Sequence, residues 1–451
     1  MNSVSLFGLG KLGAVIAGCY ASRGFEVIGV DISPDLVQRC NAGVPPVQEP
    51  GIEDLYRSCG KRLAATLNGT AAVLASDATL IAVPTPSGDD GGYSLQYVLE
   101  ASMVIGKALR EKSDYHLVVL KSTVLPGSCE GDIVPRLEET SGKRCGADFG
   151  FCYNPEFIAL GSVINNIFNP DLNLIGESDS YAGESLVGIY RRLLTDKFPT
   201  ARMNLVNAEL SKLAVNSYVT MKISFANLVA GLCEQLPGAN IDMVTAALGL
   251  DKRIGPKYLK GGLGFGGPCF PRDNAAMLSL ARRLGVAFPL AEATDRANQD
   301  VPARVADFVA ARAPAHGRVS ILGLSYKPDT YVIEESQSLM IAKLLADRAF
   351  EVTAYDPLAM ELARGFLGNR VRYAQSAQAC VDSADVVVIA TPWKEFKNLN
   401  YTSHDLARKP MVIDCWGLLD RTAQQSVAII RLGANAISDL PRDEQIKRKN
   451  L

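Results

Sequence analysis

Residues 3–13 read SVSLFGLGKLG, and this stretch decides the fold class. The apolar run SVSLF has the length of a strand and leads directly into three spaced glycines. Residues 11–24, KLGAVIAGCYASRG, have the apolar spacing of a helix and end at a glycine, and a second strand-like run, FEVIGVD, follows at residues 25–31. Strand patterns that alternate with helix patterns predict a parallel, doubly wound α/β sheet.

Gly8, Gly10 and Gly13 form a GxGxxG pattern, which is informative here because it lies between a predicted strand and a predicted helix. Gly8 permits a tight turn, Gly10 lets a pyrophosphate approach the backbone, and Gly13 lets the helix pack closely on the strand. The helix that starts near Leu12 offers N–H groups to phosphates. Asp31 can accept hydrogen bonds from ribose hydroxyls and would repel a 2′-phosphate. We predict an NAD site, and the alternative is a glycine turn without a cofactor.

The strand and helix rhythm returns near the end of the chain. FEVTAYD at residues 350–356 resembles FEVIGVD, and ADVVVIATP at residues 384–392 resembles the run at residues 77–86, DATLIAVPTP. The corresponding glycine turn, residues 323–328, reads GLSYKP and has no GxGxxG pattern. We therefore expect a second α/β domain of the same plan that binds a different ligand.

The middle of the chain carries little β signal. Residues 207–236 form one long helical pattern, NAELSKLAVNSYVTMKISFANLVAGLCEQL, whose length predicts a bridge between domains or subunits. The 451 residues are also too many for one ordinary domain. We predict two Rossmann-like α/β domains, residues 1–200 and 301–451, joined by a central helical domain, residues 201–300.

Composition argues against several classes of partner. The net charge is -2 and no long basic run occurs, which argues against nucleic acid. No apolar stretch approaches the roughly 20 residues of a membrane span, and the opening MNSVSLFGLG does not resemble a secretory signal. The ten cysteines form no CxxC pair, which favours free thiols in the cytoplasm. The three histidines, His116, His316 and His404, lack metal-ligand spacing and are expected at the surface or at helix caps, so we predict no metal site.

Residues 261–273, GGLGFGGPCFPRD, place Cys269 in a loop with few side chains around it. A thiol beside a nicotinamide suggests covalent capture of an oxidised product. A thiolate that attacks an aldehyde gives a thiohemiacetal, which can lose a second hydride to become a thioester, and water then releases a carboxylate. A thiolate here would be favoured by nearby N–H groups and cations. The alternative is a buried, inert thiol.

Three further positions carry groups suited to that chemistry. Lys212 and Asn216 are four residues apart on the long helix and could together stabilise an alkoxide, although a solvated lysine beside a surface asparagine is the simpler alternative. Asp273 could orient a water or cap the following helix. Glu156, in CYNPEF, could act as the base for thioester hydrolysis or be a turn carboxylate.

These motifs together resemble the family of UDP-glucose and GDP-mannose dehydrogenases, closest in look to UDP-glucose 6-dehydrogenase. The resemblance rests on FGLGKLG, DGGYSLQYV, KSTVLPG, YNPEF, ELSKLAVNSYVTMKISFAN, RIGPKYLKGGLGFGGPCFPRD, GLSYKPDT and YDP, and it covers nearly the whole chain. It implies oxidation of a nucleotide-sugar C6 alcohol to a uronic acid with two NAD, through a cysteine-bound intermediate. UDP-glucose is the default substrate, and GDP-mannose and UDP-N-acetylhexosamines remain open.

The resemblance also implies roles for single residues and an assembly. Cys269 matches the family's nucleophile, and Glu156 matches the glutamate that serves in hydrolysis of the thioester. The resemblance also implies the following roles. Lys212 and Asn216 hold the C6 oxygen, Asp273 and Thr123 place water and nicotinamide, Thr85 and Arg272 contact the cofactor, and Tyr258, Gly262, Gly266 and Lys327 hold the sugar nucleotide. Arg253 matches an arginine offered by a neighbouring subunit, so a homodimer built on the long helix is expected, with the C-terminal domain holding the nucleotide.

Four positions depart from the family pattern. Residues 170–173, PDLN, lack the usual arginine. Leu160 stands where a second glutamate is usual, and Glu334 and Trp416 stand where arginines are frequent. These changes leave open the sugar and the strength of cofactor binding. Two other hypotheses stay in view. One is an enzyme that stops after one oxidation, because other two-domain dehydrogenases also place a lysine and an asparagine four residues apart on a helix. The other is a protein that binds NAD and a nucleotide sugar with little turnover, which is supported only by Leu160, Glu334 and Trp416.

Overall fold

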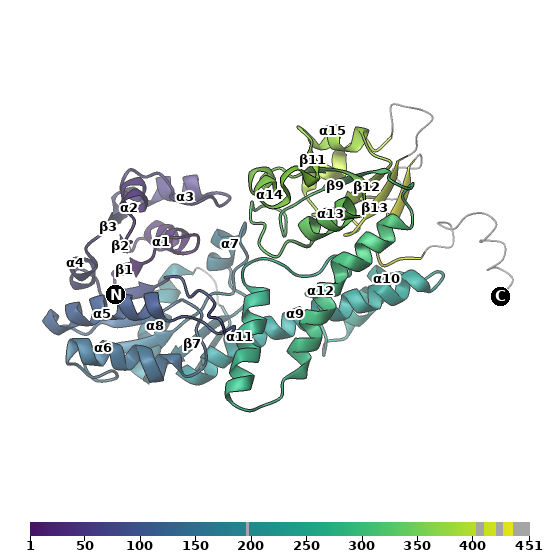
Figure 1. Ribbon diagram of the computed structural model, residues 1–451. Helices are drawn as coiled ribbons and strands as arrows, with labels where there is room; N and C mark the ends of the chain where they lie inside the picture. Colours follow the sequence, from purple (N-terminus) through teal and green to yellow (C-terminus); the bar gives the residue numbers. More distant parts are fainter. Residues whose placement is uncertain (195–197, 403–409, 421–426, 436–451) are drawn as a thin grey trace. The chain divides into compact units, whose positions relative to one another are not determined.

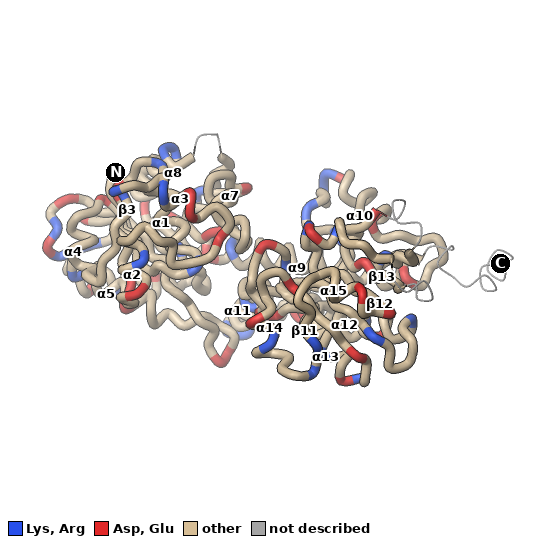
Figure 2. The backbone as a smooth tube through the Cα atoms, turned by 90° about the horizontal axis from the view of Figure 1, so that it is seen from above, with Lys and Arg blue, Asp and Glu red and all other residues tan. Residues whose placement is uncertain are grey.

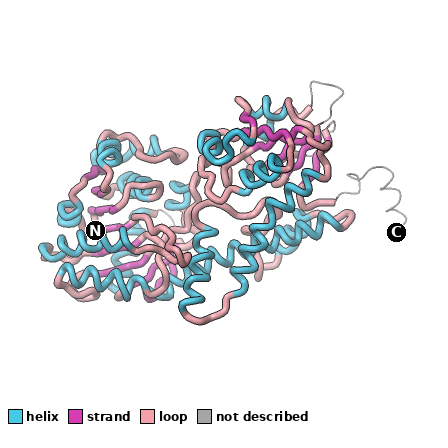
Figure 3. Tube along the Cα trace, viewed as in Figure 1, coloured by secondary structure: helices cyan, strands magenta, loops and turns pink. Residues whose placement is uncertain are grey.

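The computed structural model describes residues 1–194, 198–402, 410–420 and 427–435 (Figure 1). By its contacts the chain forms two compact units. The first unit contains residues 1–215 and 275–286, and the second contains residues 216–274 together with the described part of 287–451. In each unit the strands lie together and helices flank them (Figure 3).

The first unit is built on an eight-stranded sheet with the order β3-β2-β1-β4-β5-β6-β7-β8. Its strands are β1 Ser3–Phe7, β2 Glu26–Val30, β3 Leu63–Thr66, β4 Ala78–Ile81, β5 Leu117–Leu120, β6 Gly150–Tyr153, β7 Asn173–Glu177 and β8 Thr200–Asn204. All neighbours run parallel except β6 and β7, which are antiparallel. The strand order reverses between β1 and β4, and ligands of such sheets bind outside the carboxyl ends of the strands at this place.

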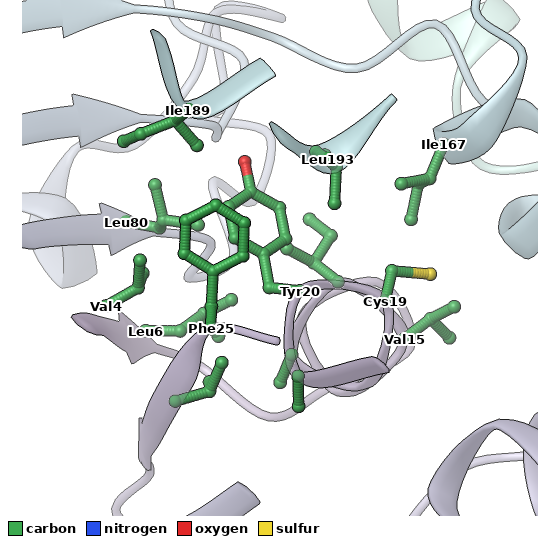
Figure 4. Close-up of a cluster of buried hydrophobic side chains, with 14 of the residues drawn as sticks. Val4, Leu6, Val15, Cys19, Tyr20, Phe25, Leu80, Ile167, Ile189 and Leu193 are labelled. Carbon is green, nitrogen blue, oxygen red and sulfur yellow. The ribbon is translucent and has the colours of Figure 1, made fainter. Parts of the chain in front are cut away.

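Helices cover both faces of this sheet. They are α1 Gly13–Ser22, α2 Pro34–Asn41, α3 Ile52–Cys59, α4 Gly69–Leu74, α5 Gln96–Glu111, α6 Val134–Ser141, α7 Val163–Phe168 and α8 Ser180–Leu193. Strand residues alternate between two cores, since Leu117 and Val119 pack with α1, α3, α7 and α8, whereas Val118 and Leu120 pack with α4, α5 and α6. Figure 4 shows the first core, in which Tyr20 of α1 and Phe25 lie among aliphatic side chains with ring centroids 5.4 Å apart.

The second unit contains a six-stranded sheet, all parallel, with the order β11-β10-β9-β12-β13-β14. Its strands are β9 Arg318–Leu322, β10 Glu351–Tyr355, β11 Arg372–Tyr373, β12 Val386–Ile389, β13 Met411–Asp414 and β14 Ala428–Arg431, with helices α13 Gln337–Asp347, α14 Met360–Leu367 and α15 Ala377–Asp382. Here the order reverses between β9 and β12. The predicted fold of two doubly wound α/β sheets is therefore confirmed.

The middle of the chain is helical, as the sequence predicts. It contains α9 Leu205–Gln235, α10 Ile241–Leu250, α11 Phe270–Arg283 and α12 Pro289–Ala310. The helix α9 matches the predicted long helix closely and contributes residues to both units. Within the described residues no helix has the length and apolarity needed to cross a bilayer. Basic and acidic residues are scattered over the described parts of both units (Figure 2).

His116 corrects one expectation, because it lies neither at the surface nor at a helix cap. It precedes β5, is fully buried, and its Nε2 lies 2.7 Å from the Thr79 hydroxyl. Burial lowers the pKa of His116 to about 3, so the imidazole is neutral in the folded chain. His316 is exposed, and His404 lies outside the described residues.

Candidate active site

The glycines after β1 each meet a different requirement of the turn. The N–H of Gly8 donates to the Val30 carbonyl at 2.8 Å with a φ of +96°, and a Cβ there would lie 2.7 Å from the Ala82 carbonyl oxygen. A Cβ on Gly13 would lie 1.9 Å from the Gly8 carbonyl oxygen, so only glycine lets α1 start this close to the strand. A Cβ on Gly10 would meet no described atom within 4 Å, which leaves open space beside the backbone.

Asp31 is held across this turn by both of its carboxylate oxygens. Oδ2 accepts from the N–H of Leu9 at 2.7 Å, and Oδ1 accepts from the N–H of Ser33 at 2.9 Å. Each carboxylate oxygen can accept a second hydrogen bond, so ribose hydroxyls still have acceptors. Leu12 occupies the position just before α1, where the N-terminal N–H groups are free of helical partners. The open backbone at Gly10, the helix start and Asp31 therefore fit a dinucleotide.

Thr85 and Thr123 lie together at the same edge of the sheet. They follow β4 and β5 respectively, and the Thr85 hydroxyl donates to the Thr123 carbonyl at 2.9 Å. Because the carboxyl ends of parallel strands meet at one edge, both predicted cofactor contacts lie on the edge that carries the glycine turn.

Lys121 is a residue that the sequence analysis missed. It directly follows β5 and its side chain is only 1% exposed. Its ammonium group donates to Asn154 Oδ1 at 2.7 Å and to the Tyr190 hydroxyl at 2.9 Å, and it forms an ion pair with Glu156. The carboxylate of Glu156 is thus directed to a buried lysine of its own unit. A lysine at the carboxyl end of an apolar parallel strand was the available signal.

The YNPEF loop after β6 contacts a second lysine. The amide of Asn154 fixes the loop by donating to the Leu174 carbonyl at 2.7 Å, and the Phe157 ring centroid lies 4.6 Å from the ammonium nitrogen of Lys212. Lys212 is buried on α9. One turn earlier, the carboxylate of Glu209 accepts the N–H groups of Gly127 and Cys129 at 2.7 and 2.8 Å, which fixes the start of α9 against the turn after β5.

A small cavity borders Glu156. Tyr20, Asn173 and Tyr190 also line it, and about 10 Å³ is open to the centre of a water molecule. Among the described residues, the Tyr20 hydroxyl and the Asn173 Nδ2 are buried without a hydrogen-bond partner. A space of this size that adjoins unsatisfied polar groups fits one ordered water.

In the second unit, Cys269 stands directly before α11. Its carbonyl accepts the N–H of Asp273 at 2.8 Å, the first bond of that helix. On α9, the Asn216 amide donates to the Asp273 carboxylate at 2.5 Å, and Thr220 donates to Asn274 at 3.1 Å. The structure therefore brings together Cys269, Asp273 and Asn216, and places Lys212 one turn before Asn216 on the same helix.

Cys269 differs from the other cysteines in exposure. All ten cysteines lie within the described residues, and Cys269 alone is exposed, whereas Cys145 is half-buried and eight are buried. Desolvation raises the pKa of every one of those nine thiols, to about 11 for Cys40 and about 12 for Cys380. The raised pKa values disfavour the thiolate at those nine positions, and the exposure of Cys269 rules out the alternative of a buried thiol at that position.

Two buried asparagines, also missed, hold the glycine-rich loop. Asn227 accepts from the N–H of Gly262 at 2.9 Å and donates to the Leu263 carbonyl at 3.1 Å. Asn298 does the same with Phe265, accepting at 2.8 Å and donating at 2.9 Å. A Cβ on Gly266 would lie 2.3 Å from the Glu335 carbonyl oxygen, so this position needs glycine.

The remaining predicted positions are in the second unit. Tyr258 has a φ of +63° and an exposed side chain, and Lys327 lies after β9 with its nitrogen 6.0 Å from the Tyr326 ring centroid. Arg253 is exposed and bonds to Asp251 at 2.6 Å, which raises the pKa of the arginine. Arg272 lies in the first turn of α11.

Two of the unusual residues have structural explanations. Leu160 packs against the core that contains Tyr20, so an apolar side chain suits its surroundings. Glu334 is exposed, and its carbonyl accepts the N–H of Gly267 at 2.9 Å, so its backbone supports the glycine-rich loop.

Comparison with known proteins now adds to this geometry. Residues 2–194, 206–300 and 320–421 match the NAD binding, central and UDP binding domains of one family. The chain belongs to the UDP-glucose/GDP-mannose dehydrogenase family. It thus contains the NAD-binding domain of these nucleotide-sugar dehydrogenases.

Two relatives and one solved structure illustrate the likeness. The chain is 38% identical to a UDP-glucose 6-dehydrogenase of Haloferax volcanii, over 91% of this chain and 96% of the relative. It is 34% identical to a GDP-mannose 6-dehydrogenase of Azotobacter vinelandii, over 93% and 98%. A UDP-glucose dehydrogenase structure from Pyrobaculum islandicum has a TM-score of 0.86 at 37% identity, covering 96% of this chain and 98% of that one. Relatives named for UDP-glucose and for GDP-mannose have similar sequence identity to this chain, so similarity alone does not identify the substrate.

Proposed function

We propose that this dehydrogenase oxidises the C6 alcohol of a nucleotide sugar to the uronic acid, with UDP-glucose as the substrate and UDP-glucuronate as the product. The observation that carries the proposal is the exposed thiol of Cys269, one helical turn before the bonded pair Asp273 and Asn216. A one-step alcohol dehydrogenase has no need for an exposed nucleophile in a glycine-rich loop.

The chemistry balances with one water and two molecules of cofactor. Bound NAD⁺ supplies a hydride acceptor for each oxidation. The thiolate of Cys269 adds to the C6 aldehyde, and loss of the second hydride leaves a thioester. Water attacks the thioester carbon, the C–S bond breaks, and Cys269 leaves as thiolate. One alcohol, two NAD⁺ and one water thus give one carboxylate, two NADH and three protons.

Each polar side chain of the site has a part in this sequence. Lys212 and Asn216 donate hydrogen bonds to the C6 oxygen, which carries negative charge as the alkoxide before the first hydride transfer, after thiolate addition and after attack of water on the thioester. Asn216 has a second N–H for this purpose, because only one N–H is engaged by Asp273. Glu156 accepts a proton from the attacking water, and Asp273 and Thr123 position water and nicotinamide.

The decisive experiment counts NADH and acid on a panel of sugar nucleotides. We expect two NADH per UDP-glucose, and little from UDP-galactose, GDP-mannose or UDP-N-acetylmannosamine. Cys269→Ser should lower kcat for acid formation by about a thousandfold or more, because the covalent step is lost. Cys145→Ser is the matched control and should be unaffected. One NADH per sugar, or a Cys269→Ser variant with normal acid formation, would contradict the proposal; binding without any NADH would instead indicate a binding protein.

The ion pair between Lys121 and Glu156 gives a second test, directed at hydrolysis. Glu156→Gln, and Lys121→Met to a smaller degree, should leave the two oxidations fast and slow the release of acid. Stopped-flow absorbance should then show a burst of two NADH per site followed by a slow steady state. Glu130→Gln, which alters an exposed carboxylate, should show no burst. A Glu156→Gln variant that simply loses the first oxidation would place this carboxylate elsewhere in the mechanism.

We also propose a homodimer through α9. Tyr218, Phe225, Leu228 and Leu232 are exposed apolar residues that recur at helical spacing along one side of α9, and Leu228 and Leu232 are 60% and 63% exposed. A second copy of the same helix would cover this stripe and could bring Arg253 to the partner's substrate. Leu232→Glu should convert a dimer to a monomer in light scattering, whereas Leu362→Glu, at an exposed leucine of α14, should not.

A further inference from the structure

Trp416 stands at the edge of the second sheet where ligands bind. It follows β13, its indole N–H donates to the Ala390 carbonyl at the end of β12 at 2.8 Å, and its backbone N–H donates to Asp414 at 3.0 Å. The strand order reverses between β9 and β12, so Ala390 borders the reversal. In open α/β sheets the ligand binds outside the carboxyl ends of the strands at such a reversal.

The glycine-rich loop lies directly on this indole. A Cβ on Gly262 would be 3.0 and 3.1 Å from two ring carbons of Trp416 and 2.8 Å from the Cys415 carbonyl oxygen. A glycine at this position is therefore what allows the large ring to fit beneath the loop. The two residues form one arrangement, which we call the Gly262–Trp416 contact.

Arg431 fixes both sides of the Gly262–Trp416 contact. Its guanidinium is buried and uses all five N–H groups. Two bond to Asp242 at 2.9 Å each, two bond to the Cys415 and Leu432 carbonyls at 2.7 and 2.6 Å, and one bonds to the Gly261 carbonyl at 2.8 Å. The residues that precede Gly262 and Trp416 are thus held by one rigid group, so the indole has a fixed position at the edge of the sheet.

We propose, on the basis of the proposed function, that Trp416 is a substrate-binding residue whose indole face forms a wall of the nucleotide site and packs on the base of the nucleoside diphosphate. The side chain is only partly buried, which leaves part of the ring open. It also lies within residues 320–421, the stretch that matches the UDP binding domain of the family. A neutral ring contributes through apolar and stacking contact, so its share of the affinity is insensitive to salt.

The two tryptophans of the chain provide a direct readout. Trp393 is buried and its indole donates to Asp356 at 3.1 Å, so its surroundings are filled by protein. In Trp393→Phe, emission from Trp416 alone should be quenched saturably by UDP, without any sugar. In the matched Trp416→Phe variant, emission from Trp393 should not respond to UDP. An unchanged emission in Trp393→Phe, while calorimetry on the same sample shows UDP bound, would overturn the proposal.

Affinity measurements give an independent check. Trp416→Leu should weaken UDP binding between about fivefold and a hundredfold, because base–aromatic stacking is worth roughly 1–3 kcal/mol. Trp416→Phe should keep most of the affinity, and the ratio between wild type and Trp416→Leu should not change with salt. Equal UDP affinity in wild type and Trp416→Leu would contradict the proposal. NADH formation on the substrate panel does not depend on this emission, so failure of the proposed function would be recognised separately.

Discussion

Gly8 and Gly323 end the central strands of the two sheets with the same backbone conformation. Both have a φ of +96°, and their N–H groups donate at 2.8 Å to carbonyls at the ends of the neighbouring strands, Val30 and Tyr355. In both turns the next residue donates its N–H at 2.7 Å to an aspartate that follows the neighbouring strand. The two domains thus repeat one strand, turn and carboxylate arrangement.

The two aspartates nevertheless have different surroundings. Asp31 is half-buried and accepts two backbone hydrogen bonds. Asp356 is 1% exposed and accepts six: two from the N–H and hydroxyl of Ser325, one from the Trp393 indole, and three from other backbone N–H groups. The carboxylate of Asp31 can still accept hydrogen bonds from a ribose, whereas the acceptor positions of Asp356 are occupied by donors of its own domain.

The two turns also differ in how many residues lie between the turn and the next helix. In the first domain α1 begins at Gly13, directly after the turn, and offers its N-terminal N–H groups there. In the second, α13 begins at Gln337, and residues 324–336 intervene. The same turn can therefore suit dinucleotide binding in one domain, whereas in the other its hydrogen bonds hold neighbouring segments of the protein together.

The largest expected difference between the domains is in stability. Asp356→Asn should lower the free energy of unfolding by roughly 3 kcal/mol or more. The amide NH₂ group of the asparagine would face the N–H and O–H groups that now donate to the buried carboxylate, and those hydrogen bonds would be lost. Asp31→Asn should cost at most about 1 kcal/mol and instead weaken NADH binding. Urea unfolding followed by tryptophan fluorescence measures the first effect, and NADH titration measures the second. Equal destabilisation by the two variants would remove the distinction.

Acid should also act on one domain before the other. His116, with a pKa of about 3, is neutral when folded and charges near pH 6.5 when unfolded. The unfolded chain therefore binds more protons below pH 6.5, and stability falls as the pH falls, by about 1.4 kcal/mol per unit and about 2 kcal/mol at pH 5.

The chain offers a way to locate this acid effect. Both tryptophans lie in the second unit, so circular dichroism should report acid unfolding of the first unit before fluorescence changes. His116→Gln should reduce the pH dependence. Coincident transitions by both methods would mean that the first unit does not lose stability by itself.

The smallest expected effect is on cofactor affinity alone. Gly10→Ala adds a methyl group where no described atom lies within 4 Å, so the melting temperature should not change. If the pyrophosphate passes this point, crowding of about 1.4 kcal/mol, within the usual range for an added methyl group, should weaken NADH binding about tenfold. Ser325→Ala, at the matching position of the second turn, should leave NADH affinity unchanged. Normal NADH affinity in Gly10→Ala would mean that the cofactor does not approach this backbone.

Sequence patterns predicted those structural features that depend on residues close together in the chain. Apolar runs and glycines predicted several strands of both sheets, among them β1, β2, β4, β10 and β12, together with the turn after β1 and the long helix α9, because these features have a local period. Side-chain chemistry and the family resemblance assigned Asn216 and Asp273 to one site; the two side chains share a hydrogen bond, and their roles stay a prediction.

Burial and long-range partners could not be predicted in the same way. FEVIGVD and FEVTAYD look alike, and part of the difference between Asp31 and Asp356 comes from Trp393, which lies 37 residues after Asp356, and from the Ser325 hydroxyl, 31 residues before it. Lys121 looked like the end of an apolar run, and only the fold shows that Asn154, Tyr190 and Glu156 surround it. Arg431 belongs to no motif at all.

The distribution of thiols has a practical consequence. Because eight of the other nine thiols are buried and Cys145 is half-buried, an alkylating reagent at neutral pH should react first with the exposed sulfur of Cys269. Limited labelling with a mass-tagged reagent would therefore count competent sites in an unmutated preparation, and protection by a sugar nucleotide would report occupancy without any turnover. The same exposure should make Cys269 the first of the ten cysteines to be oxidised.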